Sequence, residues 1–286
     1  MLPVSVIGGI IMDIKGLPRE GALLHHSNRG KITYTPGGVG RNIAENLVRL
    51  GVPVSMFGVV GDDPFGQRLI EDCRKLGMNT EGIVCKAGQN TAVDLGLLQP
   101  DGDLWLSVTE MQITEDLRVG EVARFAERLF TSSMIVADAN LSVEVLQYVL
   151  TGANQRGIPF LIDPVTIHFC DKLNDLKGDI YVATPNQAEA TKLTKNVDKL
   201  LISCGKDGCN LQSTHYQQDF PALTVDKLVD TTGAGDAFLA GLVAALYHNV
   251  DWPDCIQWGQ ACAALTLQSM HNVRPDLNLG MLQAMI

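Results

Sequence analysis

The most informative stretch is a run of small residues before a helix-forming segment, Val229-Asp230-Thr231-Thr232-Gly233-Ala234-Gly235-Asp236-Ala237-Phe238. The backbone N–H groups of Gly233, Ala234 and Gly235 can approach an anion closely, and the dipole of the following helix adds positive potential there. Asp236 stands where that helix begins, so its carboxylate is placed to take a proton from a hydroxyl group as a phosphoryl group arrives. The structural alternative is that Asp236 caps the helix and the glycines form a tight turn.

A second glycine-rich stretch, Thr35-Pro36-Gly37-Gly38-Val39-Gly40-Arg41-Asn42, also precedes a segment with helical spacing. Its glycines permit close backbone approach to a ligand or a hinge, and Arg41 and Asn42 offer donors in the first helical turn. The stretch does not match the G-x-G-x-x-G fingerprint of dinucleotide-binding proteins, and the chain contains no G-x-x-x-x-G-K-[ST] phosphate loop. The missing fingerprint therefore disfavours a dinucleotide-dependent oxidoreductase as the function of this chain.

The cysteines and histidines show no pattern of a metal site or a disulfide framework. Seven cysteines include no C-x-x-C pair, and six histidines include no H-x-x-H or H-x-x-x-H spacing. We expect the thiols to be reduced and to act as small buried hydrophobic groups.

Composition sets the class of protein. The chain has 286 residues, of which 46% are apolar, and a formal net charge of −10 that disfavours a nucleic-acid partner. The longest clean apolar stretch, residues 238–247, is too short to cross about 30 Å of hydrocarbon, so we expect no membrane association. The first residues lack a basic region, so we expect no secretory signal and a cytoplasmic location.

Short apolar stretches alternate with helical ones along most of the chain. This order predicts an α/β fold whose mostly parallel sheet is covered by helices on both faces. The expected strands are 4–9, 54–60, 134–137, 160–162, 180–182 and 200–203, and the expected helices are 38–50, 65–75, one from 143, 237–247 and 255–270.

Two segments interrupt this alternation. Residues 31–35 and 92–108 alternate polar with apolar residues, and Pro100-Asp101-Gly102-Asp103 is a strong turn signal within the second. We predict a small β lid formed by about residues 14–35 and 91–109, with an ordinary edge hairpin as the alternative. Its alternating leucines predict pairing with the lid of a second copy, and hence a homodimer.

Taken together, the two glycine-rich stretches resemble the paired signatures of the ribokinase-like sugar and nucleoside kinases, also called the phosphofructokinase-B type. The other matching residues are Asp13, Asn186-x-x-Glu189 and Gly205-Lys206-Asp207-Gly208, so the resemblance extends over nearly the whole chain. It implies one ribokinase-like α/β domain over residues 1–286 with a small β lid. It also implies ATP-dependent transfer of a phosphoryl group to an alcohol.

Within that family, residues 30–47, 136–140 and 161–165 are similar to pseudouridine kinases. That similarity implies transfer of the γ-phosphoryl group of ATP to the 5′-hydroxyl of pseudouridine or a related nucleoside. The alternatives are another acceptor, such as ribose, fructose or adenosine, and a non-catalytic sugar- or nucleoside-binding protein of the same fold. Selectivity for a base would lie in the lid and in residues such as Thr109, Glu110 and Met111.

By the same resemblance, Asp13 holds sugar hydroxyls, a task that suits a carboxylate because it accepts from two hydroxyls without competing as a donor. The other residues assigned to the acceptor are Gly37, Gly38, Arg41, Asn42, Asp138 and Asn140. Family members commonly carry Asn two residues before the aspartate, where this chain has Ile11. The structural alternative makes Asp13 a turn residue at the end of a strand.

The resemblance also assigns a nucleotide site. Its residues are Asn186, Glu189, Ser203, Gly205, Gly208 and Thr232. Glu189 is expected to act on Mg²⁺ through a water, although the spacing Asn-x-x-Glu is also common on structural helices. Asp230 and the Thr232 carbonyl match positions that bind a monovalent cation such as K⁺ in some relatives. Only residues 194–199 separate the helix expected at 186–193 from the strand at 200–203, where relatives usually have an additional helix. Donor affinity or specificity is therefore expected to differ.

Overall fold

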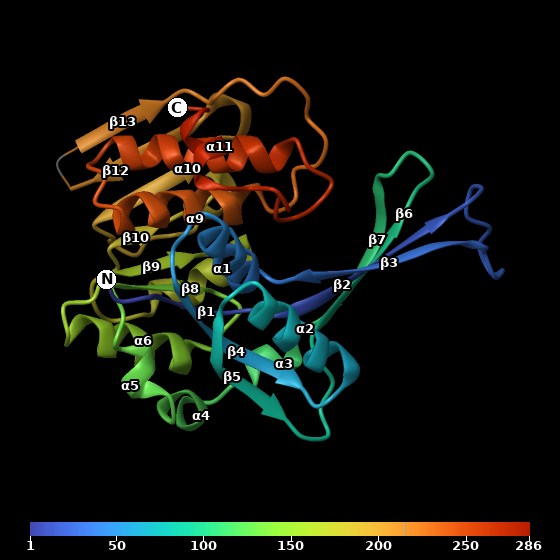
Figure 1. Ribbon diagram of the computed structural model, residues 1–286, viewed down its shortest axis with the longest axis horizontal. Coiled ribbons are helices and arrows are strands. Elements are labelled where there is room, and N and C mark those ends of the chain that lie inside the picture. The colour runs from blue at the N-terminus through green and yellow to red at the C-terminus, as the bar shows by residue number, and fades with distance from the viewer. Residues whose placement is uncertain (215) are drawn as a thin grey trace.

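The computed structural model describes residues 1–214 and 216–286 (Figure 1). Within these residues the larger sheet has nine strands in the spatial order β13-β12-β11-β10-β9-β8-β1-β4-β5. Neighbouring strands from β11 to β5 are parallel, and β12 and β13 add an antiparallel edge. The strands are β1 (Val4–Ile7), β4 (Val54–Gly61), β5 (Asn79–Lys86), β8 (Met134–Asp138), β9 (Phe160–Asp163), β10 (Val182–Ala183), β11 (Lys199–Ser203), β12 (Cys209–Ser213) and β13 (Tyr216–Phe220).

Helices cover both faces of this sheet, as the alternation of strands and helices predicted (Figure 1). One face packs against α1 (Val39–Arg49), α2 (Pro64–Lys75), α9 (Ala234–Tyr247), α10 (Asp254–Leu267) and α11 (Leu279–Gln283). The other packs against α3 (Gln112–Glu115), α4 (Val119–Ala123), α5 (Ala126–Leu129), α6 (Val143–Asn154) and α7 (Cys170–Asn174). The remaining short helices are η1 (Ile167–Phe169), α8 (Gln187–Ala190) and η2 (Gly205–Asp207).

Successive strand residues supply the two apolar cores in turn. In β8, Met134 and Val136 belong to the core beneath α9 and α10, whereas Ile135 and Ala137 belong to the core beneath α6. Side chains of a strand point alternately to opposite faces, so a strand buried on both faces must be apolar throughout. This explains why the central strands β1, β8 and β9 are mostly apolar runs in the sequence, whereas the edge strands β5, β12 and β13 are not.

A second, four-stranded sheet projects from the main body (Figure 1). We call it the lid sheet. Its order is β3-β2-β6-β7, from β2 (Ile11–Pro18), β3 (Gly30–Gly37), β6 (Val93–Leu98) and β7 (Leu104–Glu110). The alternating stretches of residues 92–108 are the antiparallel strands β6 and β7, and β6 pairs in parallel with β2. Asp13 lies inside β2, so the alternative that it ends a strand as a turn residue is wrong.

The helices differ in whether a side chain caps their first N–H groups, which decides whether these groups can bind a ligand. The first N–H groups of α2 and α6 are capped by the side chains of Asp63 and Ser142, as is usual for helices. Helices α1 and α9 instead begin at Gly38 (φ 99°) and Gly233 (φ 79°), and neither has a side-chain cap. In the described part of the chain, the turn before α9 keeps backbone donors that no side chain occupies. At α1, by contrast, the Gly40 N–H donates to Asp138 Oδ2 and the Arg41 N–H donates to the Gly9 carbonyl.

Cysteine burial and surface charge complete the description. All seven cysteines are free thiols, and five are buried as expected, but Cys204 is partly exposed and Cys85 is exposed.

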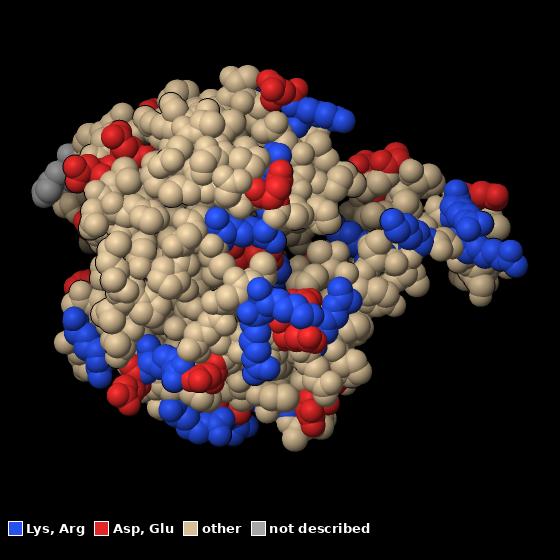
Figure 2. All heavy atoms as spheres, in the orientation of Figure 1, with Lys and Arg blue, Asp and Glu red and all other residues tan. Residues whose placement is uncertain are grey.

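Lys and Arg side chains lie among Asp and Glu side chains on the face shown in Figure 2. In residues 1–214 and 216–286, no helix has both the length and the apolar character that a membrane span requires.

Candidate active site

Asp236 and Asn42 meet where helices α9 and α1 begin. Asn42 Nδ2 donates to Asp236 Oδ2 at 2.8 Å, and both side chains are buried. Asp236 is the third residue of α9 and makes no capping bond, so the alternative that it caps the helix is not what the fold contains. Asn42 Oδ1 has no hydrogen-bond partner within the described residues. Asn42 therefore orients the carboxylate of Asp236.

The surroundings of Asp236 favour its protonated form. Burial raises the pKa of this carboxyl well above its usual range, and the negative charges of Asp163 and Asp138 raise it further. The Asn42 hydrogen bond and the charge of Arg41 act in the opposite direction. A carboxylate with a raised pKa is a better proton acceptor than one exposed to water.

The turn before α9, residues 233–235, leaves backbone donors beside Asp236. A β-carbon at Gly233 would lie 2.1 Å from the carbonyl oxygen of Asn272, and the positive φ also excludes other residues. Gly235 faces open space. Because α9 is 14 residues long and uncapped, the N–H groups of Gly233, Ala234 and Gly235 form a positive end to which an anion can bind.

Asp138 anchors the start of α1. It is fully buried, and Oδ2 accepts from the backbone N–H groups of Gly9 (2.7 Å) and Gly40 (2.8 Å), while Oδ1 accepts from that of Asn140 (2.9 Å). A β-carbon at Gly8 would lie 2.2 Å from the Asp138 carboxylate, so the glycine permits this contact. The resemblance implied that Asp138 contacts the acceptor; the structure shows its carboxylate accepting these backbone N–H groups, and the acceptor contact stays a prediction.

The Arg41 side chain, also predicted to contact the acceptor, is held by its own helix. Both terminal nitrogens of its guanidinium donate to Glu45 Oε2, one turn along α1, and the side chain is buried. Arg49 donates to the other oxygen of Glu45. Arg41 lines a separate cavity of about 310 Å³ between the lid sheet, α1, α2 and the loop at residues 271–275. Its terminal nitrogens are therefore engaged within the protein, whereas its buried Nε has no hydrogen-bond partner among residues 1–214 and 216–286.

Asp13 is held by a residue far away in the sequence. Asn272 Nδ2 donates to Asp13 Oδ2 at 2.8 Å, and a β-carbon at Gly37 would lie 2.3 Å from the same oxygen. Gly38 is equally constrained, because a β-carbon there would lie 2.4 Å from the Gly9 carbonyl oxygen. Burial and the nearby charge of Asp94 raise the pKa of Asp13 to about 6, against the lowering effects of Asn272, Lys15 and Arg41.

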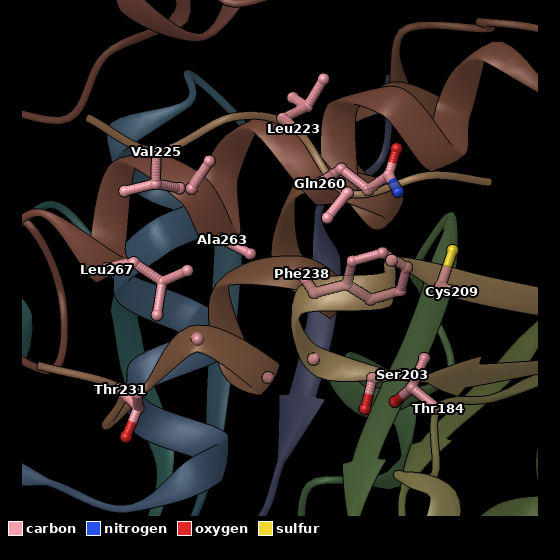
Figure 3. A pocket seen from close by; sticks show the side chains of 16 residues that line it. Thr184, Ser203, Cys209, Leu223, Val225, Thr231, Phe238, Gln260, Ala263 and Leu267 are labelled. Carbon is pink, nitrogen blue, oxygen red and sulfur yellow. The ribbon is translucent and has the colours of Figure 1, made fainter. Parts of the chain in front are cut away.

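Three of the six residues predicted to bind the nucleotide line a cavity of about 260 Å³ next to the start of α9, which we call the nucleotide-side cavity (Figure 3). Ser203, Gly205 and Gly208 line one side, and Ala234 and Gly235 line another. Gly208 has a φ of 96°, and a β-carbon there would lie 1.9 Å from the Phe220 carbonyl oxygen. Apolar side chains that the sequence did not single out form most of the remaining wall: Leu223, Val225, Phe238, Ala263 and Leu267.

Asn186 and Glu189 form a capping box at the start of α8. Asn186 Nδ2 donates to Glu189 Oε1 (2.7 Å), its backbone N–H donates to Oε2 (2.9 Å), and its Oδ1 accepts from the Glu189 backbone. Asn186 also forms a parallel bridge with Ser203, which lines the cavity. The Asn-x-x-Glu motif therefore caps a helix, and this cap lies at the edge of the nucleotide-side cavity.

Asp163, at the end of β9, is an acidic residue that the sequence analysis did not assign to the site. It accepts from the Val165 backbone (2.7 Å) and from Thr184 Oγ1 (3.2 Å). Burial raises its pKa to about 7, and the charges of Glu189 and Asp138 add to the rise. A divalent cation would relieve this repulsion between Asp163 and Glu189.

The oxygen donors present suit Mg²⁺. Within the described residues no three His, Cys, Asp or Glu side chains are close enough to hold a metal ion by themselves. Mg²⁺ usually keeps several waters and few protein ligands, so Asp163 and Glu189 fit it through waters and nucleotide phosphates. Asp230 is partly exposed, and its Oδ1 accepts from the Thr232 backbone and hydroxyl at 2.9 and 2.7 Å.

Comparisons with known proteins agree with this arrangement. Residues 1–276 match the sequence profile of the pfkB family carbohydrate kinases. A pseudouridine kinase of Escherichia coli K12 is 29% identical, over 97% of this chain and 94% of that protein. A ribokinase of Schizosaccharomyces pombe is 26% identical, over 94% of this chain and 92% of that protein.

Solved structures show the same fold. A ribokinase of Arabidopsis thaliana complexed with ribose and ATP has a TM-score of 0.83 at 18% identity and covers 99% of this chain and 98% of its own. A carbohydrate kinase of Agrobacterium tumefaciens has a TM-score of 0.84 at 24% identity, with coverages of 100% and 97%. The fold class predicted from the sequence is confirmed.

Proposed function

The chain belongs to the pfkB family of carbohydrate kinases and is a phosphotransferase with an alcohol acceptor; we propose that it phosphorylates the 5′-hydroxyl of pseudouridine with ATP. The observation that carries the proposal is the position of Asp236. Asn42 orients this carboxyl at the start of α9, where the N–H groups that no side chain caps border the nucleotide-side cavity. The proposed proton acceptor, the anion-binding turn and the nucleotide-side cavity are thus adjacent to one another.

In the proposed reaction, Asp236 takes the proton of the acceptor hydroxyl while its oxygen bonds to the γ-phosphorus. The bond between that phosphorus and the oxygen leading to the β-phosphate breaks, and ADP leaves. The N–H groups of Gly233, Ala234 and Gly235 bind the negative charge on the transferred group. Bound Mg²⁺ would neutralise charge on the donor phosphates, with Asp163 and Glu189 as the residues that hold it through water.

Other predicted residues have the following proposed roles. Asp13 accepts hydrogen bonds from sugar hydroxyls, and the missing β-carbons of Gly37 and Gly38 leave room for the Asp13 carboxylate and the Gly9 carbonyl beside the acceptor. Asp138 acts as a positioning residue that fixes the start of α1, which carries Asn42. Ser203, Gly205 and Gly208 contact ATP, and Asp230, held by Thr232, binds a monovalent cation.

The acceptor is proposed from similarity to the E. coli pseudouridine kinase together with the polar surface of the lid sheet around Asp13. The ribokinase relative keeps free ribose as the main alternative. A binding protein without catalysis is disfavoured because Asp236, Asn42 and the anion-binding turn are all in place.

The first experiment is an ATP-consumption assay with pseudouridine, uridine, adenosine, ribose and fructose, each with and without Mg²⁺. We expect ADP formation with pseudouridine only when Mg²⁺ is present, and a kcat/KM for ribose at least about 10-fold lower because ribose lacks the base. Mass spectrometry of the product checks that one phosphoryl group is added. Equal turnover of ribose and pseudouridine would contradict the proposed acceptor, and binding of pseudouridine without ADP formation would contradict the proposed catalysis.

The lid sheet is proposed to pair two copies of the chain. Its face opposite Asp13 carries the exposed side chains of Ile32, Leu95, Leu106 and Val108, at 61, 42, 53 and 62% exposure. Exposed apolar patches of this kind on small proteins commonly mark interfaces. Association of two lids would remove these side chains from water.

Sedimentation velocity at micromolar concentration is expected to show a dimer. Leu106→Asp is expected to weaken the dimer by at least about 10-fold, because a carboxylate would be buried in the interface. Ile286→Asp is the matched control, since Ile286 has a similar exposure of 52% but lies at the C-terminus. A wild-type monomer under these conditions would rule the interface out.

A further inference from the structure

Four residues form a polar row across the lid sheet. Asp13 in β2 is aligned with Thr35 in β3 on one side and with Asp94 in β6 on the other, and Asp94 is aligned with Thr109 in β7. Aligned residues on neighbouring strands point to the same face of a sheet. The Asp13 end of the polar row contacts Asn272 of the main body, and the row extends from there along the lid sheet to the exposed Thr109.

Asp94 presents one carboxylate oxygen in a fixed position. Ser107 Oγ donates to Asp94 Oδ1 at 2.6 Å, and Thr109 Oγ1 donates to the same oxygen. In the described part of the chain, Oδ2 receives no side-chain or backbone hydrogen bond. The two hydroxyls therefore hold the carboxylate in one orientation and leave Oδ2 as an acceptor without a partner.

This arrangement is electrostatically unfavourable without a ligand. Asp94 and Asp13 are like charges in aligned positions on neighbouring strands, a placement that destabilises a sheet. The cations near Asp13 are Lys15, two residues along β2, and Arg41, whose terminal nitrogens are bound to Glu45. A ligand that donates hydrogen bonds to both carboxylates would offset the repulsion.

We propose that Asp94 makes the enzyme select acceptors whose base donates an N–H group to the lid. This inference rests on the proposed function: the sugar hydroxyls bind Asp13, and the base extends along the polar row to Asp94. Pseudouridine and uridine have the same sugar, but pseudouridine carries an N1–H where uridine carries a C5–H. A carboxylate oxygen accepts from the N–H, whereas against the C–H it stays without a hydrogen bond.

The test compares kcat/KM for pseudouridine, uridine and ribose in the wild type and in Asp94→Asn. The hydroxyls of Ser107 and Thr109 hold the amide oxygen of the new side chain, which places its NH₂ group where Oδ2 was. Two donors then oppose each other, so kcat/KM for pseudouridine is expected to fall about 10-fold, with little change for uridine and ribose. The preference for pseudouridine over uridine therefore falls by the same factor.

Asp101→Asn is the matched control. Asp101 lies in the turn between β6 and β7, where its Oδ1 accepts only from the nearby Asp103 backbone. The Asp101→Asn substitution removes one negative charge from the same lid sheet without altering the polar row, so the preference for pseudouridine over uridine is expected to stay unchanged.

Three results would overturn the inference. If the wild type phosphorylates uridine and pseudouridine with equal kcat/KM, the proposed selectivity is absent. The proposed phosphotransfer would still stand in that case. An equal loss for all three acceptors in Asp94→Asn would mean that Asp94 acts only through Asp13 or lid stability. If no acceptor is phosphorylated, the proposed function fails, and thermal-shift binding of pseudouridine and uridine to both proteins decides the inference: equal binding of the two nucleosides to the wild type rejects it.

Discussion

Asp236→Asn is expected to lower kcat by at least about 10²-fold while acceptor binding changes little. The amide has the shape of the carboxylate, and its oxygen can still accept the hydrogen bond from Asn42 Nδ2. It cannot take up the proton of the acceptor hydroxyl, so the step that makes the hydroxyl a nucleophile is lost. Steady-state kinetics with saturating ATP, together with acceptor binding by calorimetry, separates the two effects.

Asp254→Asn is the matched control for this variant. Asp254 also lies in the first turn of a 14-residue helix, α10, but it is exposed and does not line the cavity beside Asp236. Removing it costs only the interaction with the helix dipole, about 0.3–1 kcal/mol, and leaves turnover unchanged. If Asp236 served only the helix, both variants would lose a similar amount of stability and neither would lose turnover.

Stability measurements add a second distinction. The folded-state pKa of Asp236 is raised, so its contribution to stability is present below the unfolded-state pKa and is lost as pH rises through the folded-state value. At neutral pH the buried carboxylate therefore disfavours the folded state, and Asp236→Asn is expected to melt at the same temperature as the wild type or above it. Near-normal turnover in this variant would remove Asp236 from the catalytic role.

The sequence predicted those parts of the molecule that depend on local patterns. The alternating apolar strands and the two glycine-rich helix starts were located correctly, because Gly38 and Gly233 adopt backbone angles that few other residues tolerate. The turn at residues 100–103 lies between the predicted strands for the same local reason. The resemblance assigned Asp138 to the acceptor, whereas its contacts with backbone N–H groups at the start of α1 are visible only in the structure, because residue type and spacing do not reveal them.

Other features depend on contacts between distant segments. Asn272 follows α10 without any local motif, and its role is visible only when the fold brings it to Asp13, 259 residues away. The nucleotide-side cavity is lined by ordinary apolar residues such as Leu223 and Phe238, which in sequence are indistinguishable from core. Asp163 did carry a signal, since it ends a buried strand as Asp138 does, and parallel strand ends gather at one edge of the sheet.

The second large effect is expected at Asp13, where Asp13→Asn should weaken acceptor binding by about 10²-fold, the loss of two charge-assisted hydrogen bonds. The Asn272 amide still donates to the oxygen of the new side chain, which leaves its NH₂ group toward the sugar hydroxyls. Asp103→Asn, in the turn of the same lid, removes an equal charge and is expected to bind the acceptor normally.

The pH dependence of binding identifies Asp13 itself. Its pKa is raised to about 6, so the carboxylate is ionised and accepts from hydroxyls above that pH and is protonated below it. The acceptor Kd is therefore expected to rise about 10-fold between pH 7 and pH 5. Measuring this in the Asp236→Asn background without ATP removes the titration of Asp236, and Asp13→Asn in that background should abolish the dependence. A Kd that stays constant over this range would show that the ionised Asp13 does not hold the acceptor.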